Sequence, residues 1–178
     1  MSLYVMRHGE TFGNIAKVLD GRRESPLSDN GKLQAKSAGE LLSEVEFYKV
    51  FSSPLSRAIE TAKFATKNKY AVSIDERLIE RSCGEFEGLS FDKIDRVKYW
   101  NYYDDSQYVS VEPIKDLFDR VHKFLDELKK DYGDKDILIV THNGVTKAIK
   151  CYFEGIPEDG DLLNIGQQNC EIRKYDWR

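Results

Sequence analysis

Short apolar runs and longer segments of helical periodicity alternate along this chain of 178 residues. The apolar runs have the length of strands and lie at residues 3–6, 49–52, 71–74 and 136–140. Apolar positions at helical spacing predict helices at residues 31–45, 53–68, 113–131 and 144–153. Residues 170–175 alternate in polarity and predict a last strand at or near the edge of a sheet.

Two of these helices carry more detailed predictions. The second helix is expected to begin at Ser53-Pro54, with the serine as N-cap and the proline in the first helical position. The first helix is expected to bury an apolar side made of Leu33, Ala38, Leu41 and Leu42.

Strands that alternate with helices indicate an α/β domain with a mostly parallel sheet. The run at 136–140 is rich in β-branched residues, which is typical of strands buried on both faces of such a sheet. At ~150 residues per domain, the length corresponds to about one domain. Residues 1–178 are therefore expected to form a single unit.

Composition narrows the class of protein. Lys and Arg number 27 against 31 Asp and Glu, and this acidic balance argues against a nucleic-acid partner. No apolar run has the length of a membrane span and no secretory signal is visible, so membrane association is not expected. Three cysteines without a Cys-x-x-Cys pair favour reduced thiols and a cytoplasmic location. No pattern in the chain predicts an oligomeric state.

Arginine and histidine side chains follow three of the predicted strands. Arg7 and His8 follow the first strand, Arg57 follows the second, and His142 follows the run at 136–140. Ligands of parallel sheets bind beyond the carboxyl ends of the strands, so these side chains are expected to converge. Two of the strand ends lead into helices, whose free N–H groups favour anions. The residues therefore predict a pocket for phosphate or another oxyanion.

Less specific interpretations of the same residues remain open at this level. His8 could bond to the backbone at a strand end, and His142 could be a satisfied polar group after a core strand. Arg57 could pair with Glu60 on the surface of a helix. His122 lies in an amphipathic helix and is expected to have no role.

Other phosphate-transfer and hydrolytic chemistries lack their sequence marks. The chain has no Gly-x-x-x-x-Gly-Lys-[Ser/Thr] loop, no cysteine followed six residues later by arginine, no Gly-x-Ser-x-Gly elbow and no His-x-x-x-His helix. No metal or other cofactor is therefore expected, and arginine and histidine would stabilise the charge of a transferring phosphoryl group. A carboxylate would act as acid and base, and spacing alone leaves Glu80, Glu85 and Glu87 as candidates.

Five segments, in order along the chain, resemble the motifs of the histidine phosphatase superfamily in its phosphoglycerate mutase-like branch. They are Arg7-His8-Gly9-Glu10-Thr11 with Asn14; Ser25-Pro26-Leu27-Ser28 with Gly31 and Gln34-Ala35; Ser52-Ser53-Pro54-Leu55-Ser56-Arg57-Ala58 with Glu60-Thr61-Ala62; Leu78, Glu80, Gly84, Glu87 and Gly88; and Val140-Thr141-His142-Asn143-Gly144. The resemblance implies a three-layer α/β/α sandwich with a mostly parallel central sheet.

The resemblance also implies roles for the site residues. His8 would be the nucleophile that forms a phosphohistidine, while its other ring nitrogen donates to a backbone carbonyl. Glu80 would protonate the leaving alcohol and then activate water. Arg7, Arg57 and His142 would complete the catalytic set. The phosphoryl group would be bound by Arg7, Asn14, Gly21, Arg57, His142 and Asn143.

Residues 85–112 depart from the mutases of the family, which carry a longer insert with several basic residues. This segment holds three basic residues and is expected to form a small cap over the site. Ordinary packing is the favoured explanation of its aromatic residues, and contact with substrate is the other: Phe86, Phe91, Tyr99, Trp100, Tyr102, Tyr103 and Tyr108. Val111-Glu112-Pro113 replaces a Gly-Glu-Ser typical of the family, so a local change in the pocket wall is expected.

The resemblance therefore implies a metal-independent phosphatase that hydrolyses a small phosphorylated metabolite through phospho-His8. A phosphoglycerate mutase and a non-catalytic module that binds a phosphorylated ligand are the alternatives. Sugar phosphates, nucleotide-pathway phosphates, phosphoserine and α-ribazole phosphate are all compatible with these residues. Cys83 lies close to Glu80 in the sequence, which makes its reactivity a question for the structure.

Overall fold

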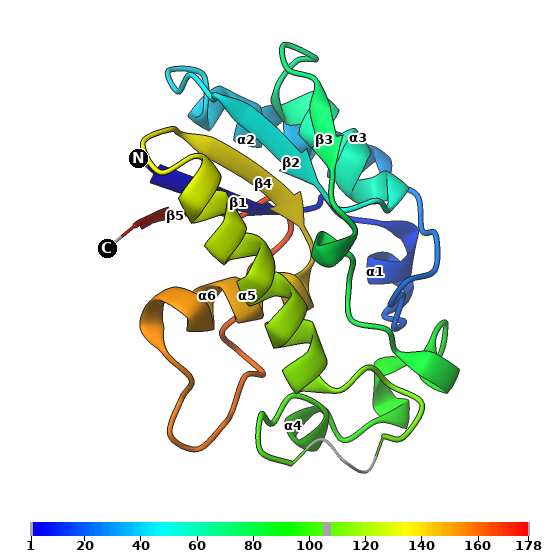
Figure 1. Ribbon diagram of the computed structural model, residues 1–178. Coiled ribbons are helices and arrows are strands. Elements are labelled where there is room, and N and C mark those ends of the chain that lie inside the picture. The colour runs from blue at the N-terminus through cyan, green and yellow to red at the C-terminus, as the bar shows by residue number, and fades with distance from the viewer. Residues whose placement is uncertain (1, 105–107, 178) are drawn as a thin grey trace.

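A five-stranded sheet lies at the centre of the computed structural model, which describes residues 2–104 and 108–177 (Figure 1). The strand order is β3-β2-β4-β1-β5. The strands are β1 (Ser2–Arg7), β2 (Lys49–Ser52), β3 (Val72–Ile74), β4 (Ile137–Thr141) and β5 (Ile172–Asp176). The first four are parallel, whereas β5 pairs antiparallel with β1 at the edge. The predicted mostly parallel sheet, with its last strand at an edge, is confirmed.

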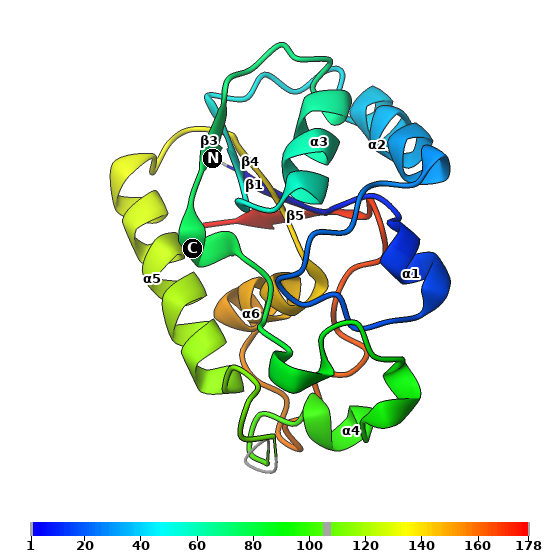
Figure 2. The same ribbon diagram turned by 90° about the vertical axis from the view of Figure 1, so that its right-hand side faces the viewer.

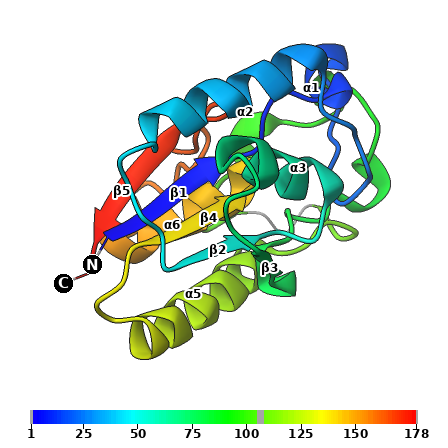
Figure 3. The same cartoon turned by 90° about the horizontal axis from the view of Figure 1, so that it is seen from above.

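Different helices cover the two faces of the sheet, as the view from above shows (Figure 3). The helices are α1 (Phe12–Ala16), α2 (Asp29–Leu41), α3 (Ser56–Ala65), α4 (Arg96–Tyr99), α5 (Ile114–Asp131) and α6 (Asn143–Glu154). Ile137 and Ile139 of β4 pack in one hydrophobic core with α5 and α6. Leu138 and Val140 point to the other face, into a core with α2 and α3. The chain is thus a three-layer α/β/α sandwich, as predicted.

The predicted start of α3 is wrong by two residues. The backbone N–H of Ser53 donates to the carbonyl of Val140 at 3.1 Å, so Ser53 still pairs with β4. The helix can begin only after this contact ends, and it starts at Ser56 with Leu55 as its N-cap. The hydroxyl of Ser53 accepts from the backbone N–H of Leu55 at 3.3 Å.

The predicted apolar side of α2 is also partly wrong. Leu33 and Leu41 are 61% and 80% exposed, whereas Ala38 is buried as expected. The helix packs so closely on α3 that a Cβ on Gly39 would lie 2.3 Å from the carbonyl oxygen of Ala65. Because only small side chains fit such an interface, the leucines face outward. Leu42, just beyond the helix, is buried as predicted.

The segment between β3 and α5 folds largely as single turns. It contains α4 and three 3₁₀ turns, η1 (Glu76–Leu78), η2 (Gly84–Phe86) and η3 (Phe91–Lys93). Most of its aromatic residues pack in a small core that it shares with Leu19, whereas Tyr102 packs on the main core and Tyr103 is exposed. Tyr99 is fully buried there, which supports packing as one role of these aromatics. In the described part of the chain, no helix is both long and apolar enough to cross a bilayer.

Candidate active site

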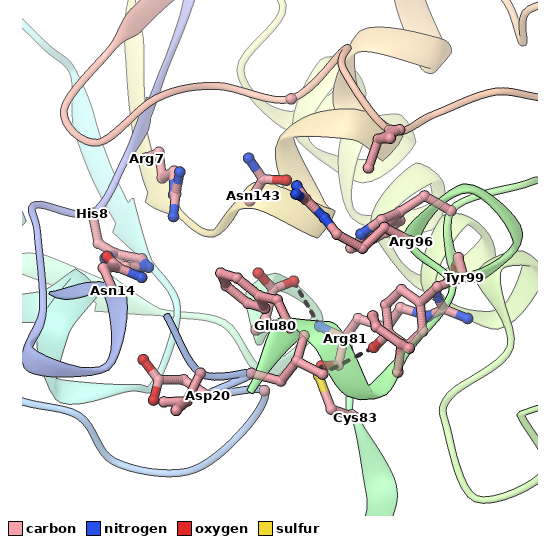
Figure 4. A pocket seen from close by; sticks show the side chains of 18 of the residues that line it. Arg7, His8, Asn14, Asp20, Glu80, Arg81, Cys83, Arg96, Tyr99 and Asn143 are labelled. Carbon is pink, nitrogen blue, oxygen red and sulfur yellow. Dashed lines mark hydrogen bonds between the residues drawn. The ribbon is translucent and has the colours of Figure 1, made fainter. Parts of the chain in front are cut away.

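The predicted strand ends do meet at one edge of the sheet. β1, β4 and β2 are neighbours and parallel, so the residues that follow them converge beyond the same edge. The ring centroids of His8 and His142 are 5.1 Å apart, although 134 residues of chain separate the two. A cavity of 380 Å³ opens beside His8 (Figure 4).

The ring of His8 is oriented by its own neighbour. Its Nδ1 lies 2.7 Å from the carbonyl oxygen of Gly9, which can only accept, so Nδ1 carries the proton. In the neutral ring Nε2 is then left with its lone pair. Burial, followed by the charges of Arg7 and Arg57, holds the pKa of His8 well below its usual value. The imidazole is therefore neutral and able to act as a nucleophile near neutral pH.

His142 begins α6 as its N-cap and is fully buried. Its Nε2 lies 2.6 Å from the hydroxyl oxygen of Ser53, the residue that follows β2. Its Nδ1 has no hydrogen-bond partner among the described residues. Burial, with the charge of Arg57 and the ring of His8, lowers its pKa as well. His142 is the one predicted phosphate ligand that does not line the cavity among the described residues.

Two arginines line the cavity without a carboxylate partner. Arg57 is 1% exposed, and its guanidinium donates to the carbonyls of Arg23 at 2.8 Å and Gly21 at 2.7 Å. Arg7 donates to the carbonyl of Gln167 at 3.0 Å. In the part of the chain that is described, neither makes an ion pair, and Nε of each is unbonded. Buried cations without anions are costly, so an anionic ligand fits between them.

The surface pairing of Arg57 with Glu60 is therefore not found. Arg57 points inward from the first turn of α3, whereas Glu60 is exposed. Gly21 lines the cavity, and its carbonyl positions Arg57. Its φ of +52° suits glycine, and a Cβ there would lie 2.5 Å from a carboxylate oxygen of Glu87.

Two asparagine amides complete the wall around His8. Asn14 is part of the capping box of α1, in which its Oδ1 accepts from the backbone N–H of Thr11 at 3.2 Å. Asn143 lies in the first turn of α6 and donates its amide to the carbonyl of Gln167 at 2.9 Å. Both side chains reach the cavity (Figure 4).

Of the three candidate carboxylates, only Glu80 lines the cavity. Both of its carboxylate oxygens accept from the backbone N–H of Gly144 at 3.2 Å, and one also accepts from the N–H of Arg81 at 2.8 Å. Glu87 instead accepts from the backbone N–H groups of Arg22 and Cys83, and Glu85 is exposed. Figure 4 shows Glu80 between His8 on one side and Arg96 and Tyr99 of α4 on the other.

A partly buried ion pair network contacts the backbone of Glu80. The backbone carbonyl of Glu80 accepts from Arg22 at 3.1 Å and from Arg120 at 3.2 Å. Both arginines also pair with Glu112, at 3.1 Å and 2.8 Å. Burial opposes ionisation of Glu112, but the hydrogen bond and charge of Arg120 outweigh it and lower its pKa. The Val111-Glu112-Pro113 segment thus supports Glu80 through Glu112.

The rest of the cavity wall comes from the α1–α2 segment, from the α4 region and from the loop before β5. Phe91, Tyr99 and Trp100 in this wall are among the aromatic residues that the sequence analysis named. No periodicity or motif marks the other positions, because they meet only in the folded chain: Val18, Leu19, Asp20, Ile94, Arg96, Leu163, Asn164 and Gln168.

Two further buried groups lie at this wall, of which Cys83 lines the cavity and Lys147 does not. The ammonium of Lys147 lies 4.7 Å from the ring centroid of Trp100 and donates to the carbonyl of Leu163 at 2.7 Å. Burial lowers the pKa of Lys147 to about 7. Burial also raises the pKa of Cys83 to about 12, and its sulfur accepts from the hydroxyl of Tyr99. A thiol with that pKa stays protonated and reacts slowly.

His122 lies outside this constellation, with Nε2 3.0 Å from the carbonyl oxygen of Ala148. The prediction that it has no part in the site agrees with this position. Within residues 2–104 and 108–177, no group of three or more His, Cys, Asp or Glu side chains is arranged to hold a metal ion.

Comparison with known proteins places this geometry in a family. Residues 3–178 match the family described as histidine phosphatase superfamily (branch 1). An uncharacterized phosphatase, PhoE, of Bacillus subtilis is 29% identical over 98% of this chain and 90% of its own length. A glucosyl-3-phosphoglycerate phosphatase of Mycolicibacterium vanbaalenii is 30% identical over 88% of this chain and 76% of its own.

Solved structures agree with the sequence comparison. Bacillus stearothermophilus YhfR superimposes with a TM-score of 0.86 at 27% identity, covering 97% of this chain and 89% of that protein. Phosphoglycerate mutase-like proteins also occur among the relatives. The chain is therefore a member of the histidine phosphatase superfamily, in its branch 1.

Proposed function

We propose that this protein is a metal-independent phosphatase that hydrolyses a phosphomonoester through a phosphohistidine on His8. One observation carries the proposal. Nε2 of His8 is a neutral nitrogen with a free lone pair, because Nδ1 is committed to the carbonyl of Gly9. It stands beside Arg7 and Arg57, neither of which forms an ion pair among the described residues. The relatives that are phosphatases support the hydrolytic class.

The first step transfers the phosphoryl group to His8. Nε2 attacks phosphorus, and a P–N bond forms as the P–O bond to the alcohol breaks. Glu80, protonated at this stage, gives its proton to the leaving oxygen. Its two bonds to the N–H of Gly144 hold it beside the cavity, in reach of an alcohol on the far side of the phosphoryl group from His8.

The second step releases phosphate. Glu80 is now a carboxylate and takes a proton from water, whose oxygen attacks phosphorus. The P–N bond breaks, its electron pair returns to Nε2, and His8 is neutral again. Splitting the reaction in this way replaces one difficult displacement by two easier ones.

Four groups would stabilise the phosphoryl oxygens during both steps. Arg7 and Arg57 supply positive charge, and Asn14 supplies an amide donor. His142 would add a donor from Nδ1, the buried nitrogen that lacks a partner among the described residues. Since these groups are already oriented by protein contacts, little reorganisation is needed when charge develops.

We further propose that residues 85–112 form the cap that faces the alcohol portion of the substrate. Phe91, Ile94 and Trp100 from this segment line the cavity, which suits a metabolite with an apolar part. Of its basic residues, only Arg96 reaches the cavity, whereas Lys93 and Lys98 do not. A mutase must hold a second phosphate and a carboxylate as well, so this wall favours a phosphatase.

The test is release of phosphate from p-nitrophenyl phosphate, with and without EDTA, by the unmodified protein and by His8→Ala. We expect turnover that EDTA leaves unchanged and that His8→Ala abolishes. His122→Ala is the matched control, because His122 lies outside the cavity and should keep full activity. The phosphoenzyme, trapped by rapid quenching in alkali, should carry its phosphate on His8.

The same assay decides between the alternatives. Activity retained by His8→Ala would rule out the phosphohistidine mechanism. Conversion of 3-phosphoglycerate to its isomer faster than its hydrolysis would establish a mutase instead. Binding of phosphorylated compounds with no turnover of any member of a metabolite panel would establish a binding module. The same panel would identify which small phosphorylated metabolite is preferred.

A further inference from the structure

We propose that Asn169 is a positioning residue of the phosphate site, which acts by holding the amide of Asn14 with its NH₂ group toward the bound anion. Asn169 belongs to the loop between α6 and β5, residues 155–171, which carries none of the recognised motifs. Figure 2 shows this orange-to-red loop rising past the cap to the level of α1. The inference deepens the proposed function and depends on the same anion site.

Backbone groups determine the orientation of the side-chain amides of Asn14 and Asn169. The N–H of Thr11 can only donate, so the atom of Asn14 that lies 3.2 Å from it must be the oxygen Oδ1. The carbonyl of His8 can only accept, so the atom of Asn169 that lies 3.0 Å from it must be the nitrogen Nδ2. That same Nδ2 donates to Oδ1 of Asn14 at 3.1 Å.

The oxygen end of the Asn14 amide is therefore occupied, whereas its nitrogen end has no partner among the described residues. Its Oδ1 accepts from Thr11 and from Asn169, which places Nδ2 of Asn14 on the side of the cavity that it lines. Without Asn169 one of these two donors is lost. A rotated amide would then present an oxygen to the phosphate, and that oxygen would repel the anion instead of binding it.

The same loop contacts two other side chains of the site. The carbonyl of Gln167 accepts from Arg7 at 3.0 Å and from Asn143 at 2.9 Å. The side-chain amide of Gln167 anchors the loop by donating to the carbonyl of Val5 in β1 at 2.9 Å. Residues 167–169 thus orient three of the predicted phosphate ligands, although the loop itself supplies none of the reacting groups.

The test is a double-mutant cycle on orthovanadate binding, which mimics phosphate and needs no turnover. In the unmodified background, we expect Asn169→Ala to raise the Kd for vanadate about tenfold, as fits the loss of an aligned bond to a charged ligand. In the background Asn14→Ala, the same change should raise Kd less than about twofold, because the amide that it positions is gone.

A merely structural role predicts a different pattern. If Asn169 only stabilised the loop, its removal would weaken vanadate binding by the same factor in both backgrounds, and that result would overturn the proposal. Unchanged affinity in the unmodified background would overturn it as well. Asn169→Ser enters the same cycle if the alanine variant does not fold.

Asn101→Ala is the matched control, because its amide also joins a loop carbonyl, that of Asp159 at 3.0 Å, but does not line the cavity. It should lower the unfolding temperature while the Kd for vanadate stays unchanged. The proposed function is tested separately, by the activity of His8→Ala. Turnover by that variant would contradict the phosphohistidine mechanism, whatever the result of the double-mutant cycle.

Discussion

Gly144 offers the sharpest test of how Glu80 is positioned. This glycine lies in the first turn of α6, and its N–H donates to both carboxylate oxygens of Glu80 at 3.2 Å. A Cβ at this position would lie 2.4 Å from Oε1 of Glu80 and 3.0 Å from the ring of Trp100. Gly144→Ala must therefore push the carboxylate away from its place in the cavity wall.

The size of the effect follows from the distance that the carboxylate must move. An ordinary contact begins near 3.4 Å, so the oxygen has to retreat by about 1 Å, and a displacement of that size costs roughly 100-fold in rate. This corresponds to about 2.7 kcal/mol of transition-state stabilisation. Proton transfer from a positioned acid contributes roughly 100-fold or more, so the loss lies within what Glu80 can supply.

The assay compares kcat/KM for an alkyl phosphate and for p-nitrophenyl phosphate, since kcat/KM reports the step in which the alcohol leaves. We expect Gly144→Ala to lose roughly 100-fold on the alkyl phosphate and less than about tenfold on p-nitrophenyl phosphate, whose leaving group needs little protonation. Equal losses on both substrates would refute the role of Glu80 as the acid.

A matched control separates this effect from general overpacking. Gly39→Ala also creates a severe contact, because its Cβ would lie 2.3 Å from the carbonyl oxygen of Ala65, at the packing of α2 on α3. We expect it to lower the free energy of unfolding by about 1–3 kcal/mol. The ratio of kcat/KM between the two substrates should stay as in the unmodified protein.

Two predictions concern pH. Burial and the charges of Arg7 and Arg57 hold the pKa of His8 well below 6.5. We therefore expect kcat/KM to stay constant through pH 6.5 and to fall only in more acidic solution. A decrease in kcat/KM centred at pH 6.5 would contradict this. The pKa of Glu112 is also lowered on folding, so its ion pairs stabilise the protein above the unfolded pKa of about 4.3 and this contribution is lost as pH falls through the folded pKa. Glu112→Gln should accordingly lower the free energy of unfolding by about 2 kcal/mol at pH 7, with a difference that shrinks below about pH 4 in urea titrations.

The local pattern of the sequence determined the strands, most of the helices and the layered arrangement. Strands of a parallel sheet are buried on both faces and therefore appear as continuous apolar runs, as at Ile137–Thr141. The polar residues that end such runs must lie at one edge of the sheet, which is why the sequence predicts that Arg7, His8 and His142 lie together.

Contacts between distant segments determined the remaining features. The start of α3 depends on a bond from Ser53 to β4, and the buried side of α2 depends on how closely α3 approaches. Neither contact leaves a mark in local periodicity, because hydrophobic spacing reports the polarity of a position and not the distance to its neighbour.

The difference between what the sequence predicts and what only the tertiary structure determines is clearest in the candidate site. The sequence motifs predict which side chains react, but they do not predict how these side chains are oriented. Spacing alone leaves Glu80, Glu85 and Glu87 open, whereas the family motif and the fold, which places the N–H of Gly144 beside Glu80, both favour Glu80. Only the fold brings Asn169 to Asn14 across 155 residues of chain, because a hydrogen bond requires that two groups lie close in space and does not require that they lie close in the sequence.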